Sequence, residues 1–132
     1  MKILKNLFLT AFALTAVAAM NLTTAYAGDV NADSITGKWK DTDNPAIVEI
    51  QNKGSYYEGV IVEDSENPGV VSTVIFKNLV YDGANGVWEG KVYSVKRQKD
   101  YDVEIRMSGS TKFTMTVDAG LRSKKVEWDR VQ

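Results

Sequence analysis

The chain has 132 residues, with 16 basic and 17 acidic side chains, and neither histidine nor cysteine. The absence of these two residue types excludes Ser-His-Asp and Cys-His nucleophile systems, the usual zinc sites and disulfides, so we expect no enzyme, no metal and no cofactor. The near-neutral charge leaves no electrostatic footprint for nucleic acid or for an anionic membrane surface.

Residues 1–27 have the three-part pattern of a secretory signal peptide. Lys2 and Lys5 precede an apolar run over residues 7–20, and Ala25 and Ala27 supply the small residues of a cleavage site. The run is shorter than the roughly 20 apolar residues that a membrane span needs. We therefore expect cleavage after Ala27, a mature chain without a membrane span, and export to the periplasm or, alternatively, to the exterior.

The rest of the chain divides into a leader and one domain. Residues 28–36 are polar and without periodicity and are expected to form a flexible leader, whereas residues 37–132 read as a single all-β domain. Turn signals rich in Gly, Asn and Pro separate short apolar stretches throughout this domain. The expected strands are 37–41, 46–52, 55–63, 71–81, 86–95, 99–107, 111–117 and 124–131.

Alternation within these strands indicates which face is buried. In 99–107, for example, Val103 and Ile105 alternate with Asp102 and Glu104, so one face is expected to be apolar and the other solvated. The short connections favour antiparallel pairing of consecutive strands. Because closure removes exposed sheet edges, we expect a small eight-stranded up-and-down barrel.

Two motifs at the ends of the domain predict how the barrel closes. Gly37-Lys38-Trp39 opens the first strand and Trp128-Asp129-Arg130 lies in the last. Closure brings these strands together, so we expect the Arg130 guanidinium to lie over Trp39 and to cap backbone carbonyls as a structural clamp. The alternative is a surface arginine near a loose C-terminus. A Gly-x-Trp start with a late arginine resembles lipocalin-like barrels.

The order of motifs also resembles a family of small exported bacterial proteins, domain of unknown function 2147. The motifs that carry the resemblance are Gly37-x-Trp39, Val48-Glu49-Ile50, Tyr57-x-Gly59-x-Ile61-Val62, Trp88-Glu89-Gly90-Lys91-Val92-Tyr93, Lys99-x-Tyr101 and Trp128-x-Arg130. The resemblance implies a lipocalin-like barrel and export, without an established activity. The chain departs from the family pattern at Leu121-Arg122-Ser123-Lys124-Lys125, before the last tryptophan.

Aromatic residues of inward parity form the candidate ligand site. They are Trp39, Tyr57, Trp88, Tyr101, Phe113 and Trp128. They could line a lumen for a small apolar ligand, or they could simply fill a barrel that is only just wide enough for its own side chains. The alternative function is a protein-binding module, such as an exported inhibitor or immunity-type factor, that contacts an envelope protein through its loops or outer face. An exposed aromatic patch including Tyr56 and Tyr93 would favour this alternative.

Two sets of acidic residues are better explained by local structure than by catalysis or metal binding. The pairs Asp102 with Glu104 and Glu127 with Asp129 have outward parity, which is typical of a solvated strand face and not of a glycosidase site. The first turn carries Asp41, Asp43 and Asn44, which suit an Asx turn better than a calcium loop. The sequence therefore predicts neither a catalytic residue nor a metal ligand.

Overall fold

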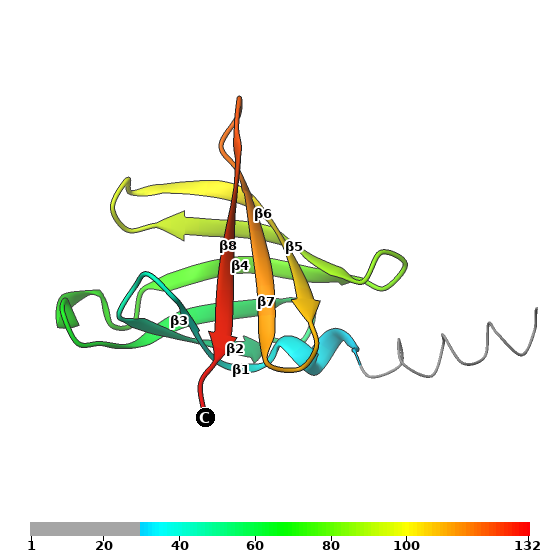
Figure 1. Cartoon of the computed structure of the whole chain (residues 1–132), viewed down its shortest axis with the longest axis horizontal. Helices are drawn as coiled ribbons and strands as arrows, with labels where there is room; N and C mark the ends of the chain where they lie inside the picture. The colour runs from blue at the N-terminus through cyan, green and yellow to red at the C-terminus, as the bar shows by residue number, and fades with distance from the viewer. Residues whose placement is uncertain (1–29) are drawn as a thin grey trace, which may run out of the picture.

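Eight antiparallel strands close into a barrel in the computed structural model, which describes residues 30–132 (Figure 1). Each strand pairs with the next along the chain, and β8 returns to pair with β1. The strands are β1 Gly37–Asp41, β2 Ala46–Asn52, β3 Tyr57–Asp64, β4 Val74–Asp82, β5 Val87–Ser94, β6 Lys99–Ser108, β7 Lys112–Asp118 and β8 Ser123–Arg130. The predicted signal peptide lies outside the described residues. Within residues 30–132, no helix has the length and apolar character to cross a membrane.

The all-β barrel predicted from the sequence is confirmed, and the strand bounds agree closely except at β4. This strand begins at Val74 and not at residue 71. A short 3-10 helix, η2 (Pro68–Val70), precedes it, and Ser72 has a positive φ of 80° that interrupts an extended strand. The amide of Ser72 donates instead to the carbonyl of Ile61, and the amide of Ile61 donates to Thr73. The β3–β4 connection is thus a turn fastened back onto β3.

The predicted parity of the strands positions the core. In β6, Val103 and Ile105 are 5% and 0% exposed, while their neighbours Asp102 and Glu104 are exposed. The same alternation runs through β7, where Phe113 and Met115 are buried. Inward side chains from all eight strands therefore meet in one continuous apolar core.

The two ends of the barrel differ. Because consecutive strands run in opposite directions, the loops gather alternately at one end and the other. We call the end where β1 begins the closed end; it also carries the turns at 53–56, 83–86 and 109–111. The opposite end, with the loops at 42–45, 65–73, 95–98 and 119–122, is called the mouth. At this end the β7–β8 ribbon projects beyond the rest of the barrel (Figure 1).

The predicted flexible leader is wrong for the part of it that the structure describes. Residues Ala32–Ile35 form a 3-10 helix, η1, at the closed end, and Ile35 is 0% exposed. Asn31 caps the helix, because its side chain accepts from the Asp33 amide while Ser34 Oγ accepts from the Asn31 amide. The capping box, the buried Ile35 and the partly buried Val30 and Ala32 thus make this segment a plug for the barrel.

Candidate functional site

Arg130 joins the last strand to the first and to the plug. Its guanidinium lies 4.2 Å from the centre of the Trp39 ring, so the contact expected from the two end motifs is present. Its nitrogens donate to the carbonyls of Ser34, Thr36 and Ser110 at 2.8, 2.7 and 2.8 Å. Arginine suits this place because its planar fork donates in several directions while its face stacks on an indole. The clamp is therefore structural.

Gly37 makes room for this clamp. A Cβ built at this position would lie 2.6 Å from Arg130 Nη1, and its φ of +124° belongs to a region that side-chain-bearing residues rarely adopt. The glycine of the Gly-x-Trp motif is thus explained by both the space and the backbone conformation.

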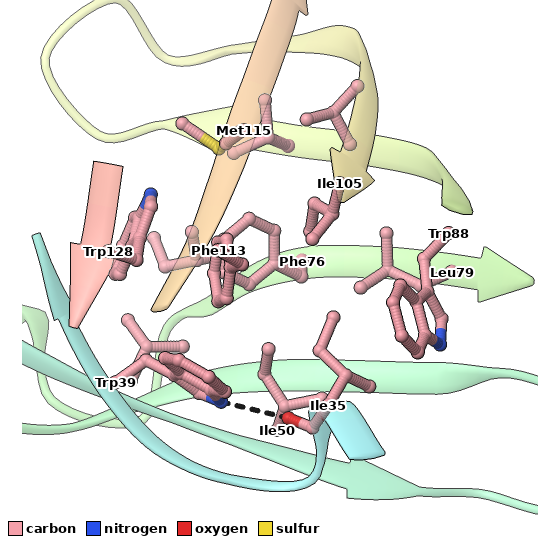
Figure 2. Close-up of a cluster of buried hydrophobic side chains, with 14 of the residues drawn as sticks. Ile35, Trp39, Ile50, Phe76, Leu79, Trp88, Ile105, Phe113, Met115 and Trp128 are labelled. Carbon is pink, nitrogen blue, oxygen red and sulfur yellow. Dashed lines mark hydrogen bonds between the residues drawn. The ribbon is translucent and has the colours of Figure 1, made fainter. Parts of the chain in front are cut away.

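Two tryptophans of the candidate ligand set bind the plug instead of facing an empty lumen. The indole N–H of Trp39 donates to the carbonyl of Ile35 at 2.8 Å, and that of Trp88 donates to the carbonyl of Ala32 at 3.1 Å (the Trp39 bond is drawn in Figure 2). Both rings are 0% exposed. Together with Arg130, they satisfy carbonyls of η1 that would otherwise be buried without partners.

Tyr57, a third member of the set, also serves the plug. Its hydroxyl donates to Asp33 at 2.6 Å, and the same carboxylate accepts from Asn52 at 2.9 Å. Burial, the hydrogen bond to Asp33 and the negative charge of that carboxylate raise the pKa of Tyr57 to about 12. Sequence reasoning missed Asp33 and Asn52. The Asn-x-x-Ser spacing at 31–34 was the one local signal for this helix.

Packed aromatic rings fill the middle of the barrel (Figure 2). Phe113 lies at ring-centre distances of 4.6 Å from Trp39, 6.2 Å from Phe76 and 5.6 Å from Trp128. Phe76 also contacts Trp128 edge-on at 5.4 Å. The candidate residues from this level of the barrel therefore contact one another, and the aromatic set fills the lower and middle lumen.

Toward the mouth, one buried hydrogen-bond donor is left without a partner, unlike the donors at the closed end. Trp128 is 5% exposed, and its indole N–H is the one buried side-chain polar atom in residues 30–132 without a hydrogen-bond partner. Figure 2 shows this nitrogen on the edge of the ring away from Trp39, on the side of Met115. Partly buried apolar side chains surround the mouth above this level: Ala46, Val70, Tyr101, Val117 and Val126.

Tyr101 is the sixth member of the candidate set and the one that reaches the mouth. It is half-buried, and Lys99 Nζ lies 5.4 Å from its ring centre. Of the six predicted lumen residues, the structure thus assigns three to the plug, two to the packed middle and one to the mouth. Trp128 belongs to both of the last two levels, because its ring is packed while its N–H is not paired.

The outer face of β4–β7 carries two shallow hollows of about 560 and 290 Å³. Outward carboxylates line them, including Glu89, Asp102 and Glu104. Lys91 forms an ion pair with Asp102, and this hydrogen bond and charge raise the pKa of Lys91. The predicted solvated strand face is present here, with the second acidic pair likewise engaged at Asp129 by Lys112 at 2.8 Å.

The first turn forms the expected Asx structure. Asp41 accepts from the Asp43 amide at 2.7 Å and from the Asn44 side chain at 2.9 Å. Among residues 30–132, no three His, Cys, Asp or Glu side chains gather as a metal site would require.

The aromatic patch that would favour the protein-binding alternative is not exposed. Tyr56 and Tyr93 are both half-buried and lie far apart. Tyr56 is in the connection at 53–56 at the closed end, and Tyr93 is on β5 toward the mouth. The exposed large apolar residues are instead scattered valines, such as Val80, and Leu121 at the tip of the β7–β8 ribbon.

These features define a small lipocalin-like barrel with a plugged closed end and an unsatisfied mouth. A family model described as an uncharacterized protein conserved in bacteria (DUF2147) matches residues 37–130, and the chain belongs to this family. The match runs from the glycine of the clamp to its arginine. This confirms the family that the order of motifs predicted.

A solved structure described as protein HP1028 from the human pathogen Helicobacter pylori, of the lipocalin family, is similar to this chain. The TM-score is 0.62 at 16% sequence identity, and the alignment covers 78% of this chain and 84% of that chain. The likeness establishes the lipocalin-like fold. No curated protein sequence matches the chain.

Proposed function

We propose that this protein is an exported, non-enzymatic binding protein whose mouth holds one small, mainly apolar molecule with a hydrogen-bond acceptor. The signal-peptide pattern of residues 1–27 supports export to the periplasm, and the lack of histidine and cysteine supports binding over catalysis. The lipocalin-like barrel supports a site at the mouth, because the mouths of β-barrels are among the preferred places for small ligands.

The observation that carries the proposal is the indole N–H of Trp128. A buried donor without a partner costs about 1–3 kcal/mol. A ligand carbonyl, carboxylate or hydroxyl oxygen that reached this N–H would remove that cost, whereas a pure hydrocarbon would not. The other tryptophans already donate to Ile35 and Ala32, so they offer a ligand no free donor.

The filled middle of the barrel limits how deep the ligand goes. Phe113 and Met115 are buried directly below the mouth, so the molecule lies over Val117 and Val126 and against the Tyr101 ring. Such a shallow site favours a ligand with a short alkyl chain or a single ring over a large lipid.

Nuclear magnetic resonance of the mature, ¹⁵N-labelled protein tests this directly. Its three tryptophans give three indole signals, and decanol and decanoate are the probes. We expect saturable binding that shifts the Trp128 signal downfield and leaves those of Trp39 and Trp88 in place.

Trp128→Phe identifies the signal and acts as the matched variant, because it keeps an aromatic ring but removes the donor. It should weaken binding of decanol by about tenfold, corresponding to about 1.4 kcal/mol. A shift of the Trp39 or Trp88 signal with the Trp128 signal unmoved would contradict the proposed site, as would the absence of binding.

A further inference from the structure

We propose that residues 123–127 of β8, here called the β8 edge, bind an extended acidic segment of another protein by adding it as a strand. The added strand would pair with the backbone of this segment, whereas the proposed mouth ligand would contact only the inward side chain of Val126, so the inference goes beyond the proposed function. Strand addition uses the free backbone groups of a sheet edge for affinity and the side chains on either face for specificity.

The edge is open because β1 is shorter than β8. β8 pairs with β7 from Ser123 to Asp129, but β1 pairs with it only through Asp41 opposite Trp128, Lys40 opposite Asp129 and Trp39 opposite Arg130. After Asp41 the chain turns away into β2. Beyond that point, β8 has no strand on its second side within residues 30–132. Figure 1 shows this half of β8 rising past the barrel wall with β7.

The free backbone groups can be assigned from the bonds of the next residues. The amide of Arg130 donates toward β7, to Thr111, whereas the amide of Val131 donates toward β1, to Lys38. In a regular antiparallel strand these directions alternate. The N–H and C=O groups of Lys125 and Glu127 therefore face the side that β1 does not reach.

The charges over residues 122–127 favour an acidic strand, because three exposed cations outnumber the one exposed anion, Glu127. Arg122, Lys124 and Lys125 are exposed, and none takes part in the ion pairs found in the described part of the chain. Lys124 has the inward parity of Trp128 and Lys125 has the outward parity, so cations flank both faces of an added strand. The chain as a whole carries a net charge of −1, so this cluster is local.

The same lysines disfavour a second copy of this chain as the occupant. Two β8 edges paired with each other would bring like charges together. Lysine on an exposed edge strand disfavours such pairing by charge repulsion. An anionic membrane could attract the cations and the fully exposed Leu121 of the ribbon tip. A membrane surface would not use the free N–H and C=O groups, and a strand would.

Calorimetric titration of the mature protein with a synthetic peptide tests the proposal. The probe is a seven-residue peptide of alternating glutamate and valine, since the edge spans about 17 Å at roughly 3.4 Å per residue. Its matched control carries N-methyl groups on alternate residues, which removes the backbone donors of one edge and keeps the charges. We expect saturable one-to-one binding of the first peptide and at least tenfold weaker binding of the N-methylated peptide.

Two variants separate charge from backbone pairing in the protein. Lys125→Ala removes the cation but keeps the edge N–H, whereas Lys125→Pro removes both without touching the β7 ladder. We expect the proline variant to bind at least fivefold more weakly than the alanine variant. The unfolding midpoints of both variants without peptide show whether the barrel is intact. If the proline variant does not fold, the comparison of the two peptides on the wild-type protein still tests the proposal.

Several results would overturn the proposal. Equal binding of both peptides, or of both variants, would mean that charge alone attracts the segment. Absence of peptide binding together with binding to phosphatidylglycerol vesicles would assign the cluster to a membrane, and a concentration-dependent dimer abolished by Lys125→Pro would assign the edge to a second copy. We expect Trp128→Phe to weaken binding of decanol at the mouth without changing peptide binding. Each of the two proposals can therefore be contradicted without the other.

Discussion

The closed end and the mouth are built by the same eight strands, yet they treat polar groups in opposite ways. At the closed end, Trp39, Trp88 and Arg130 donate to carbonyls of residues 32–36, and Asp33 accepts from Tyr57. At the mouth, the Trp128 N–H is buried without a partner.

This difference separates two roles within one small barrel. Side-chain donors paired with buried carbonyls stabilise the fold, since each unpaired group would cost about 1–3 kcal/mol. The Trp128 N–H at the mouth is buried without a partner and carries such a cost, whereas the backbone groups of the exposed β8 edge bond to water and carry none. We therefore expect substitutions at the closed end to act on unfolding and those at the mouth to act on binding.

The largest expected effect is at the clamp. Arg130→Ala removes the bonds to Ser34, Thr36 and Ser110 and the contact with Trp39. At about 1 kcal/mol for each hydrogen bond and about 0.5–2 kcal/mol for the stacking, the free energy of unfolding should fall by about 3–5 kcal/mol. Urea denaturation of the mature protein measures this loss.

The clamp should also show coupling between its two members. Trp39→Ala removes the same contact from the other side, so the double variant should lose less than the sum of the two single losses. Strictly additive losses would mean that the contact contributes nothing to stability.

A smaller effect on the free energy of unfolding is expected when one apolar side chain is truncated at each end. Ile35→Ala empties a site that is fully buried under the plug and should cost about 2–4 kcal/mol. Val126→Ala, at the half-buried mouth, should cost under about 1 kcal/mol. Denaturation midpoints of the two variants under identical conditions provide the measurement. Equal losses would contradict the division of stability between the two ends.

The smallest effect is expected in alkaline solution. Because the pKa of Tyr57 is raised from about 10 to about 12 in the folded state, folding favours its neutral hydroxyl. This contribution is complete below pH 10 and is lost as the pH rises toward 12. The difference in tyrosinate absorbance between the wild-type protein and Tyr57→Phe should therefore rise only as the pH approaches 12. A difference that rises near pH 10 would contradict the bond from Tyr57 to Asp33.

Much of this architecture could be predicted from the sequence, because strand parity depends only on alternation. The buried and exposed faces of β6 follow from Val103 and Ile105 against Asp102 and Glu104, and the structure confirms them. The contact between Trp39 and Arg130 follows from closure of consecutive strands, and it is also present. The first inference needs only the alternation within one strand, and the second needs only the order of the strands and not their stagger.

The height of each side chain along the barrel could not be predicted from parity. Trp88 and Trp128 both point inward, but the N–H of Trp88 reaches the plug while that of Trp128 does not. The open β8 edge likewise depends on the register that places Asp41 opposite Trp128. The plug could not be predicted from residues 28–36 alone, because a single short turn has no periodicity and its stability comes from residues distant in sequence.

The reach of Arg130 has a consequence for how the chain completes its folding. It holds Thr36 and Ser34, which lie 94 and 96 residues earlier in the sequence. Because synthesis proceeds from the N-terminus, the plug is made early and its anchor, Arg130, almost last. Contacts of such long separation slow folding, because a large loop must close before they form. Final locking of the barrel therefore waits for the end of the chain. A chain cut before β8 would keep the bonds from Trp39, Tyr57 and Trp88 to the plug but lose those from Arg130.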